Sequence, residues 1–253
     1  MHRFFVPPSG IQGDQVSIVG PQAHQIRHVL RMRPGDKVVV LDNSGWEIET
    51  ELQSLDGQEV RGTVVCRRLS TGEPRTKISL YQAVLKSKGF EVVLQKGTEL
   101  GIVEFVPLIS ERCIVSDLDS LEKKRPRWET IIQEAAEQSR RGRKPSLRNS
   151  ALLPQACDHA RQTGGLSLIL WEEHGPASLR TLLRTAPPGR EKHWPPFSIN
   201  LFIGPEGGFE PGEVALARRY GVVPATMGPR ILRAETAGLV AAAAVLYELG
   251  DLG

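Results

Sequence analysis

The chain has 253 residues, enough for one large domain or two modest ones with a buried core. Apolar residues make up 40% and charged residues 24% of the sequence, the composition of an ordinary globular protein. The formal net charge of +3 is small for this length, so total charge alone does not point to a nucleic-acid or membrane partner.

The sequence lacks the usual marks of a secreted, membrane or zinc-binding protein. Pro7 and Pro8 precede any long apolar run, so the N-terminus does not resemble a signal peptide. The longest apolar run, 239–247, falls short of the about 20 residues that cross a bilayer. The three cysteines are far apart with no Cys-X-X-Cys spacing, which fits neither a disulfide framework nor a zinc site. We expect a cytoplasmic protein without membrane segments or metal.

The beginning of the chain indicates β-structure. Runs rich in β-branched residues at 37–41 and 59–69 are bounded by Asn-Ser-Gly and Asp-Gly turns, which are hairpin signals. One helix is expected near 23–30. We expect these elements to form a small β-barrel domain over residues 1–72, which ends in the polar linker 70–77.

From residue 73 to residue 253, short apolar runs alternate with helical stretches. Short apolar runs are typical of buried parallel strands, and their alternation with helices predicts an α/β fold with a parallel sheet and helices on both faces. The expected strands are 78–85, 105–109, 166–170, 199–203 and 222–225. The expected helices are 91–100, 127–138, 154–161, 211–220 and 234–249.

Glycine-containing turns at the ends of these strands are candidate ligand sites. In parallel α/β sheets, ligands bind outside the carboxyl ends of the strands. Three turns meet this description, at 168–176, 201–213 and 222–236. The second reads IGPEGG, which is neither a Walker A loop nor GxGxxG, so it does not support a triphosphate or a dinucleotide held in the usual way.

The IGPEGG turn allows a ligand to approach bare backbone, because glycine has no side chain. A tight turn without any ligand is the alternative. Glu206 inside the turn, and a second glycine-containing turn that also precedes a helix, favour a pocket.

Five fragments in order connect the chain with a known family. FIGPEGGFEPGE and MGPRILRAETAGLVAAA resemble the C-terminal signature of the RsmE family, the 16S ribosomal RNA uridine-N3 methyltransferases of the SPOUT superfamily. HQIRHVLRMRPGD is similar to the N-terminal PUA-like motif of that family. EVVLQKGTELGIVEFVPLISER is similar to its first βα unit, and EAAEQSRRGRKP to its central helix and basic loop.

The resemblance implies a PUA-like β-barrel over residues 1–72 and a SPOUT domain over 73–253 with a deep C-terminal trefoil knot. It also implies S-adenosylmethionine bound in the knot, largely by backbone groups, with glycines giving access and apolar residues forming an adenine slot. The expected cofactor-binding residues are Trp171, Glu172, Ile203, Gly204, Pro205, Glu206, Gly207, Met227, Gly228, Ile231, Leu232 and Thr236.

Methylation at uracil N3 sets its own chemical demands. N3 carries a proton between two carbonyls and is a poor nucleophile until that proton leaves, so the anion must be stabilised and aligned. A guanidinium suits anionic carbonyl oxygens, which makes Arg233 the first candidate and Arg230 the second. Glu206 and Glu235 are the candidate proton acceptors. As alternatives, Glu235 favours the helix N-terminus through the dipole, and Arg230 contacts only phosphate.

Basic residues gather in three clusters at 27–33, 122–127 and 140–148. One cluster is more often a solvated face, but three against a nearly balanced total charge indicate a basic groove for RNA. For His28, a solvated or capping role is the alternative. The expected RNA-binding residues are Arg3, Arg27, His28, Arg31, Arg140 and Arg143.

The sequence therefore predicts an S-adenosylmethionine-dependent methyltransferase that acts on N3 of a uridine in 16S ribosomal RNA, within the small ribosomal subunit. A homodimer is expected, because helix 234–249 has a small-residue face suited to close packing. Two alternatives stay open. One is a SPOUT methyltransferase with another target, such as a ribose 2′-oxygen, and the other is a non-catalytic RNA-binding factor of ribosome assembly.

Overall fold

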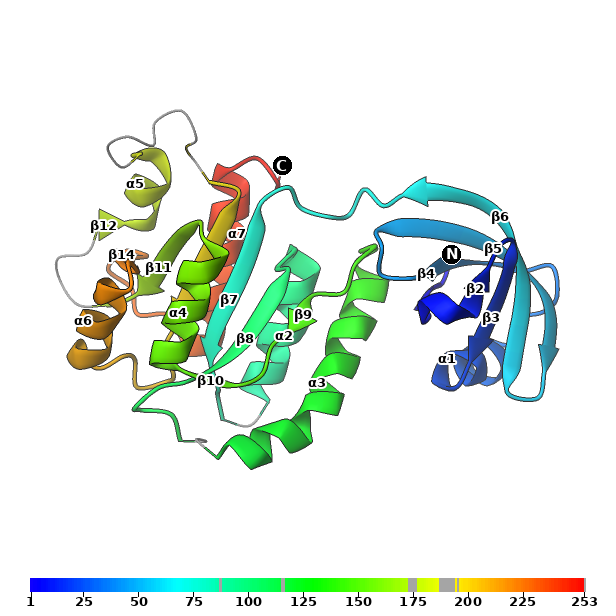
Figure 1. Cartoon of the computed structure of the whole chain (residues 1–253), viewed down its shortest axis with the longest axis horizontal. Helices are drawn as coiled ribbons and strands as arrows, with labels where there is room; N and C mark the ends of the chain where they lie inside the picture. The colour runs from blue at the N-terminus through cyan, green and yellow to red at the C-terminus, as the bar shows by residue number, and fades with distance from the viewer. Residues whose placement is uncertain (87, 115–116, 173–176, 187–193, 195, 253) are drawn as a thin grey trace. The chain divides into compact units, whose positions relative to one another are not determined.

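A computed structural model describes residues 1–86, 88–114, 117–172, 177–186, 194 and 196–252 (Figure 1). The chain divides into two compact units. The first contains Met1–Glu73 together with Gln133–Lys144, and the second contains Pro74–Ile132 and Pro145–Gly253. The domain limits 1–72 and 73–253 stay a prediction.

The first unit is built on one sheet with the strand order β1-β4-β5-β6-β3-β2. Strand β1 is parallel to β4, and the other neighbours are antiparallel. The strands are β1 (Arg3–Phe5), β2 (Ile11–Gln12), β3 (Gln15–Val19), β4 (Lys37–Leu41), β5 (Trp46–Asp56) and β6 (Glu59–Leu69). Asn43 and Gly45 have φ angles of 68° and 97°, and Gly57 has 52°. The predicted Asn-Ser-Gly and Asp-Gly hairpin turns are confirmed.

The helix expected near 23–30 is present as two consecutive segments, α1 (Pro21–His24) and the π-helical η2 (Gln25–Val29). A short 3-10 turn, η1 (Pro8–Gly10), lies earlier in the chain. Ala23 and Ile26 pack into a core with alternate strand residues, because successive strand side chains point to opposite faces. The strand residues of this core include Phe4, Val16, Ile18, Val38, Val40, Ile48, Leu52 and Val60.

Segment 133–144 belongs with the first unit because of three contacts to Phe5. Ala136 packs in one cluster with Phe5, Val39 and Leu41. The Phe5 amide donates to Glu137 Oε1 over 2.9 Å, and Lys144 Nζ lies 5.4 Å from the Phe5 ring centroid. The sequence could not reveal this assignment, because the contacts join residues more than 130 positions apart.

The second unit contains the parallel sheet that the sequence predicts. Its strand order is β10-β8-β7-β13-β11-β14-β12, with β9 paired to β8, and every neighbouring pair is parallel. The strands are β7 (Lys77–Ala83), β8 (Glu104–Ile109), β9 (Ser146–Leu147), β10 (Ala151–Leu152), β11 (Leu166–Leu170), β12 (Ala177–Ser178), β13 (Ser198–Ile203) and β14 (Val223–Thr226).

Helices cover both faces of this sheet, as predicted. On one face α2, α5 and α7 share a core with Leu80 and Leu201, and on the other α4 and α6 share one with Tyr81 and Phe202. In Figure 1, α4 and α6 lie in front of the sheet and α7 behind it. The helices are α2 (Gly89–Leu100), α3 (Leu118–Gln138), α4 (Leu153–Thr163), α5 (Leu179–Arg184), α6 (Pro211–Arg219) and α7 (Ala234–Glu248).

Helix α3 starts earlier than the sequence predicts. It begins at Leu118 instead of Arg127 and contains Pro126. Asp117 caps it, because the carboxylate accepts from the backbone amides of Asp119 and Ser120, both over 3.2 Å. Burial of Trp128 on the core of the second unit then outweighs the lost hydrogen bond of the internal proline.

The small-residue face of α7 has a different use from the one predicted. Gly238, Ala241 and Ala242 are buried within the chain, where α7 packs against α2 and the sheet. A β-carbon at Gly238 would lie 3.0 Å from Gln82 Oε1 and 3.3 Å from Ile203. Small residues there let the helix approach the strands. The homodimer stays a prediction. The trefoil knot stays a prediction.

All three cysteines are free, at Cys66, Cys113 and Cys157. Cys157 is buried, and burial raises the pKa of its thiol to about 12. This thiol therefore stays protonated at neutral pH.

Candidate active site

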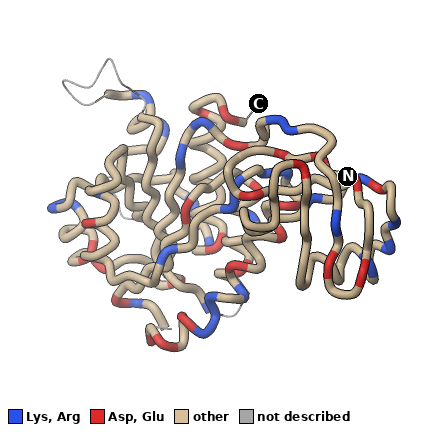
Figure 2. Tube along the Cα trace, turned by 45° about the vertical axis from the view of Figure 1, so that its right-hand side comes forward, with Lys and Arg blue, Asp and Glu red and all other residues tan. Residues whose placement is uncertain are grey.

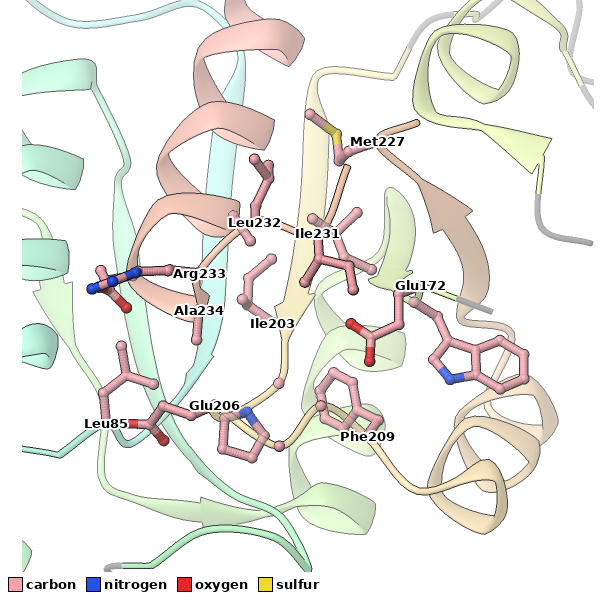
Figure 3. Close-up of a pocket in the computed structure, with 18 of the residues that line it drawn as sticks. Leu85, Glu172, Ile203, Glu206, Phe209, Met227, Ile231, Leu232, Arg233 and Ala234 are labelled. Atoms are coloured by element: carbon pink, nitrogen blue, oxygen red, sulfur yellow. The ribbon is translucent and has the colours of Figure 1, made fainter. Parts of the chain in front are cut away.

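A cavity of about 820 Å³ opens at the carboxyl ends of β7, β11, β13 and β14 (Figure 3). Its wall comes from the turns that follow these strands and from the first residues of α7. The lining residues are Leu85, Lys86, Gly89, Leu170, Trp171, Glu172, Ile203, Gly204, Pro205, Glu206, Gly207, Gly208, Phe209, Ala225, Thr226, Met227, Gly228, Arg230, Ile231, Leu232, Arg233, Ala234, Glu235 and Ala237.

The first turn, residues 204–210 after β13, is tightly folded on itself. A β-carbon at Gly204 would lie 3.1 Å from the carbonyl carbon of Gly208, a tight contact that would require the neighbouring backbone to shift. Gly208 has a φ of 69°, and a β-carbon there would lie 3.1 Å from Glu172 Oε1. The Gly208 amide donates to Pro205 O over 2.9 Å. Glycine is required here because the backbone itself forms the wall.

Two carboxylates, Glu206 of the turn and Glu213 of α6, fix the ends of this turn by accepting backbone hydrogen bonds. Glu206 Oε1 accepts from the Lys86 amide over 3.0 Å, which ties the turn to the end of β7. Glu213 Oε2 accepts from the Glu210 amide over 2.9 Å and so caps α6. Glu210 is the N-cap of α6, with Pro211 at N1.

The second turn, residues 226–233 before α7, is held much more loosely. Gly228 has a φ of 104°, and its amide donates to Thr226 Oγ1 over 3.2 Å. Ile231 is 82% exposed although it lines the cavity, and in Figure 3 it lies across the cavity from Phe209. The turn ends at Arg233, the N-cap of α7, whose carbonyl accepts from the amide of Ala237 over 2.9 Å.

Three carboxylates, Glu172, Glu206 and Glu235, and three basic side chains, Lys86, Arg230 and Arg233, line the cavity. Arg233 is 87% exposed at its side chain, and its Nη1 lies 4.0 Å from Glu235 Oε1. Glu206 is tied to the Lys86 amide. Within the described part of the chain, no hydrogen-bond donor contacts the carboxylate of Glu172, which faces the cavity between Ile231 and Phe209 in Figure 3.

Most residues that the sequence predicts for the site meet at this cavity. The three catalytic candidates, Arg233, Glu206 and Glu235, all line it. The predicted cofactor-binding residues line it as well, except Thr236, which lies in the first turn of α7 outside the wall. Of the turn 168–176, Leu170, Trp171 and Glu172 reach the cavity, and 173–176 lie outside the described residues. The chemical roles of all these residues stay predictions.

The sequence missed the part of the wall that follows β7. Leu85, Lys86 and Gly89 line the cavity because β7 pairs with β13 in the sheet, Gln82 lying opposite Ile203. Sequence patterns predict strands but not which strands are neighbours. Gly208 and Phe209 were also missed, although the second glycine of the Gly-Gly pair was a usable signal.

The predicted RNA-binding residues differ in how free their charges are. Arg3 is 9% exposed at its side chain and pairs with Glu47 over 2.6 Å, a structural position. Arg143 donates from Nε and Nη2 to Ser44 O, while Arg140 is exposed with a φ of 62°. Arg27, His28 and Arg31 lie in and just after η2. Figure 2 shows basic and acidic positions interspersed along the chain.

Metal ligation and membrane insertion find no support among the described residues. No group of three or more His, Cys, Asp or Glu side chains in this part of the chain is arranged to hold a metal ion. No helix there is long and apolar enough to span a bilayer.

Family models match both parts of the chain. A model described as an RNA methyltransferase domain matches residues 72–246, and one described as an RNA methyltransferase PUA domain matches residues 20–65.

Curated relatives and solved structures agree with these matches. A protein named ribosomal RNA small subunit methyltransferase E from Bacillus subtilis is 31% identical, over 98% of this chain and 97% of its own. The one from Synechocystis is 32% identical, over 96% of this chain and 77% of its own. The crystal structure of the Neisseria gonorrhoeae protein of that name, bound to S-adenosylmethionine, superposes with a TM-score of 0.83 at 30% identity and covers 98% of this chain and 97% of its own.

Proposed function

This chain belongs to the ribosomal RNA small subunit methyltransferase E family, and we propose that it methylates N3 of a uridine in 16S ribosomal RNA with S-adenosylmethionine as the methyl donor. One observation carries the proposal. Two glycine-containing turns meet around a cavity of mixed apolar and charged lining at the carboxyl edge of a parallel sheet. A relative with this fold is solved with S-adenosylmethionine bound.

The groups around the cavity fit that cofactor. Leu85, Ile203, Phe209 and Leu232 offer an apolar surface for a flat adenine ring, and the glycines expose backbone. Glu172 offers a carboxylate that accepts no hydrogen bond from other described residues, which suits hydroxyl or ammonium donors of a ligand. S-adenosylmethionine, when bound, supplies an electrophilic methyl group on a sulfonium.

Arg233 is the residue that we propose to stabilise the uracil anion. It lines the cavity as the N-cap of α7, and its guanidinium is exposed to an incoming base. Two carbonyl oxygens flank N3, and a planar fork of donors can hold the charge that spreads onto them. The exposed end of Glu235, 4.0 Å away, keeps the guanidinium near the cavity rim without a close ion pair.

Glu235 is the favoured proton acceptor of the two carboxylate candidates. Glu206 already accepts a backbone hydrogen bond from Lys86, so its carboxylate has a structural use. Glu235 is partly exposed and lies beside Arg233, where a proton taken from N3 can pass on to solvent. Its position in the first turn of α7 also suits the helix dipole, and the two roles are compatible.

The RNA contact that we propose uses Arg27, His28, Arg31 and Arg140. These side chains belong to the first unit, and Arg140 lies in the loop after α3. Arg3 and Arg143 are given structural roles instead, because Glu47 and Ser44 O occupy their guanidiniums.

We further propose a homodimer, a trefoil knot through the C-terminal turns, a domain boundary near residue 72 and a cytoplasmic location with the ribosome.

The decisive experiment is methylation of small ribosomal subunits from cells that lack the gene. Purified chain and S-adenosylmethionine are added, and the RNA is digested to nucleosides for mass spectrometry. We expect one 3-methyluridine per subunit. A reaction without S-adenosylmethionine serves as the negative control.

The other possible products separate the alternatives. A 2′-O-methylated nucleoside would identify a SPOUT enzyme with a ribose target and contradict the N3 assignment. No methylated product, together with no cofactor binding in calorimetry, would identify a non-catalytic assembly factor.

A further inference from the structure

Arg112 lies outside the cavity wall but contacts the turn that forms it. The residue follows β8, and its Nε donates to Glu210 Oε1 over 2.6 Å. Its Nη1 donates to the carbonyl oxygen of Gly207. A β-carbon at Gly207 would lie 3.2 Å from Arg112 Cδ, so the side chain also packs on the glycine. Arg112 therefore contacts the turn in three ways: an ion pair with Glu210, a hydrogen bond to Gly207 O and van der Waals packing on Gly207.

The residue before it makes a second tie to the same turn. The Glu111 amide donates to Glu213 Oε1 over 3.0 Å. Glu213 is 5% exposed and accepts from the Glu210 amide with its other oxygen. Two consecutive residues of one loop thus hold both ends of residues 207–213.

The charge on Arg112 is secure. The hydrogen bond to Glu210 raises the pKa of the guanidinium, with a further contribution from the charge of Glu210. Because the pair is partly exposed, its electrostatic contribution to stability is small. The contacts of Arg112 also restrict the conformation of the turn. Without them, Gly204, Gly207 and Gly208 would leave this backbone many accessible conformations.

We propose that Arg112 is a positioning residue that fixes the 204–210 turn in its cofactor-binding conformation, acting through Gly207 O and Glu210. The inference rests on the proposed function of the cavity. A turn that is ordered before the ligand arrives has less conformational entropy to lose on binding, so affinity rises without any contact between Arg112 and the ligand. Lysine cannot replace it fully, because a point charge cannot form both bonds in one plane.

The test measures S-adenosylmethionine binding by calorimetry, without RNA, on the full chain. We expect Arg112→Ala to weaken binding about tenfold and Arg112→Lys to recover part of the loss. In steady-state assays the loss should fall on KM for S-adenosylmethionine rather than on kcat. The matched control is Arg127→Ala, because Arg127 also forms a two-bond ion pair, with Glu91 over 2.6 and 2.8 Å, away from the turn. The control should bind like the wild type.

Each outcome bears on the proposal. Unchanged affinity in Arg112→Ala would overturn it, and so would an equal loss in Arg127→Ala, which would indicate general destabilisation. If Arg112→Ala does not fold, Glu210→Gln removes the partner charge and should weaken binding several-fold; a wild-type affinity there would also overturn the proposal. A wild-type chain that does not bind S-adenosylmethionine would overturn the proposed function itself, whereas wild-type binding with an indifferent Arg112→Ala refutes the positioning role alone.

Discussion

The two glycine-containing turns that line the cavity are built in opposite ways. Residues 204–210 are held by three side-chain hydrogen bonds: Glu206 of the turn accepts from the Lys86 amide, and from outside the turn Arg112 donates to Gly207 O and Glu213 accepts from the Glu210 amide. Within residues 226–233 the hydrogen bonds of the described chain join only Thr226 and Gly228, and the turn exposes Ile231 and Arg233. A rigid wall suits cofactor binding, and a pliant one suits a residue that must meet a large RNA substrate.

The largest expected effect lies in the pliant turn. Arg233→Ala should lower kcat by roughly 10²–10³, the range for loss of one oxyanion-stabilising donor. S-adenosylmethionine affinity should hardly change, because the guanidinium points to solvent at the rim. Arg233→Lys should recover little, and higher pH should partly restore the alanine variant as the imide ionises unaided. Single-turnover rates on saturating subunits check this, and a near-normal rate would reduce Arg233 to a helix cap.

A smaller loss is expected from filling the rigid turn. Gly204→Val should weaken S-adenosylmethionine binding about tenfold or more, since the added carbons meet the backbone of Gly208 and overpacking costs ~1–3 kcal/mol. Gly212→Val is the matched control, because a β-carbon there meets nothing within 4 Å. Calorimetry on both variants decides. Equal affinities would mean that the backbone of the 204–210 turn shifts as easily as that of the 226–233 turn.

Changes in the proposed RNA contact should leave the cofactor affinity of the cavity unchanged. Arg140→Ala should weaken RNA binding several-fold and reduce the slope of log K against log salt by about 1, as loss of one phosphate contact does. Arg143→Ala should reduce that slope less, because its guanidinium is bonded to Ser44 O. Cofactor affinity should stay constant in both. A salt titration of RNA binding measures both slopes. Equal slopes for Arg140→Ala and Arg143→Ala would contradict the prediction.

The smallest effect is expected at Thr226, whose hydroxyl bonds to Gly228 in the turn at 226–233. Thr226→Val removes the acceptor of the Gly228 amide at nearly constant volume. Because that amide is at an exposed turn, water can replace the acceptor, and S-adenosylmethionine affinity should change by about twofold at most. A tenfold loss in calorimetry would show that the turn at 226–233 is as ordered as the one at 204–210.

Much of the site was predictable from local sequence, because its residues come from turns with their own signatures. IGPEGG and MGPRILRAET each lie between an apolar strand and a helix, and the rule that ligands bind at the carboxyl edge of parallel strands selects them. Thr236 differs from the other predicted cofactor-binding residues in that it does not line the cavity. In the first turn of α7, Ala234, Glu235 and Ala237 reach the cavity and Thr236 does not, and a helical face is fixed only once the helix is docked.

The sequence by itself determined the alternation of strands and helices, the hairpin turns of the first unit and the two glycine-containing turns. These are local properties, set by side-chain periodicity and by the φ angles that glycine permits. Only the tertiary structure decided that β7 lies beside β13, and so brought Leu85 and Lys86 to the cavity. It alone placed Arg112 against Gly207, 95 positions away in the chain. Such pairings depend on which strands become neighbours, and that choice is made by packing of the whole core.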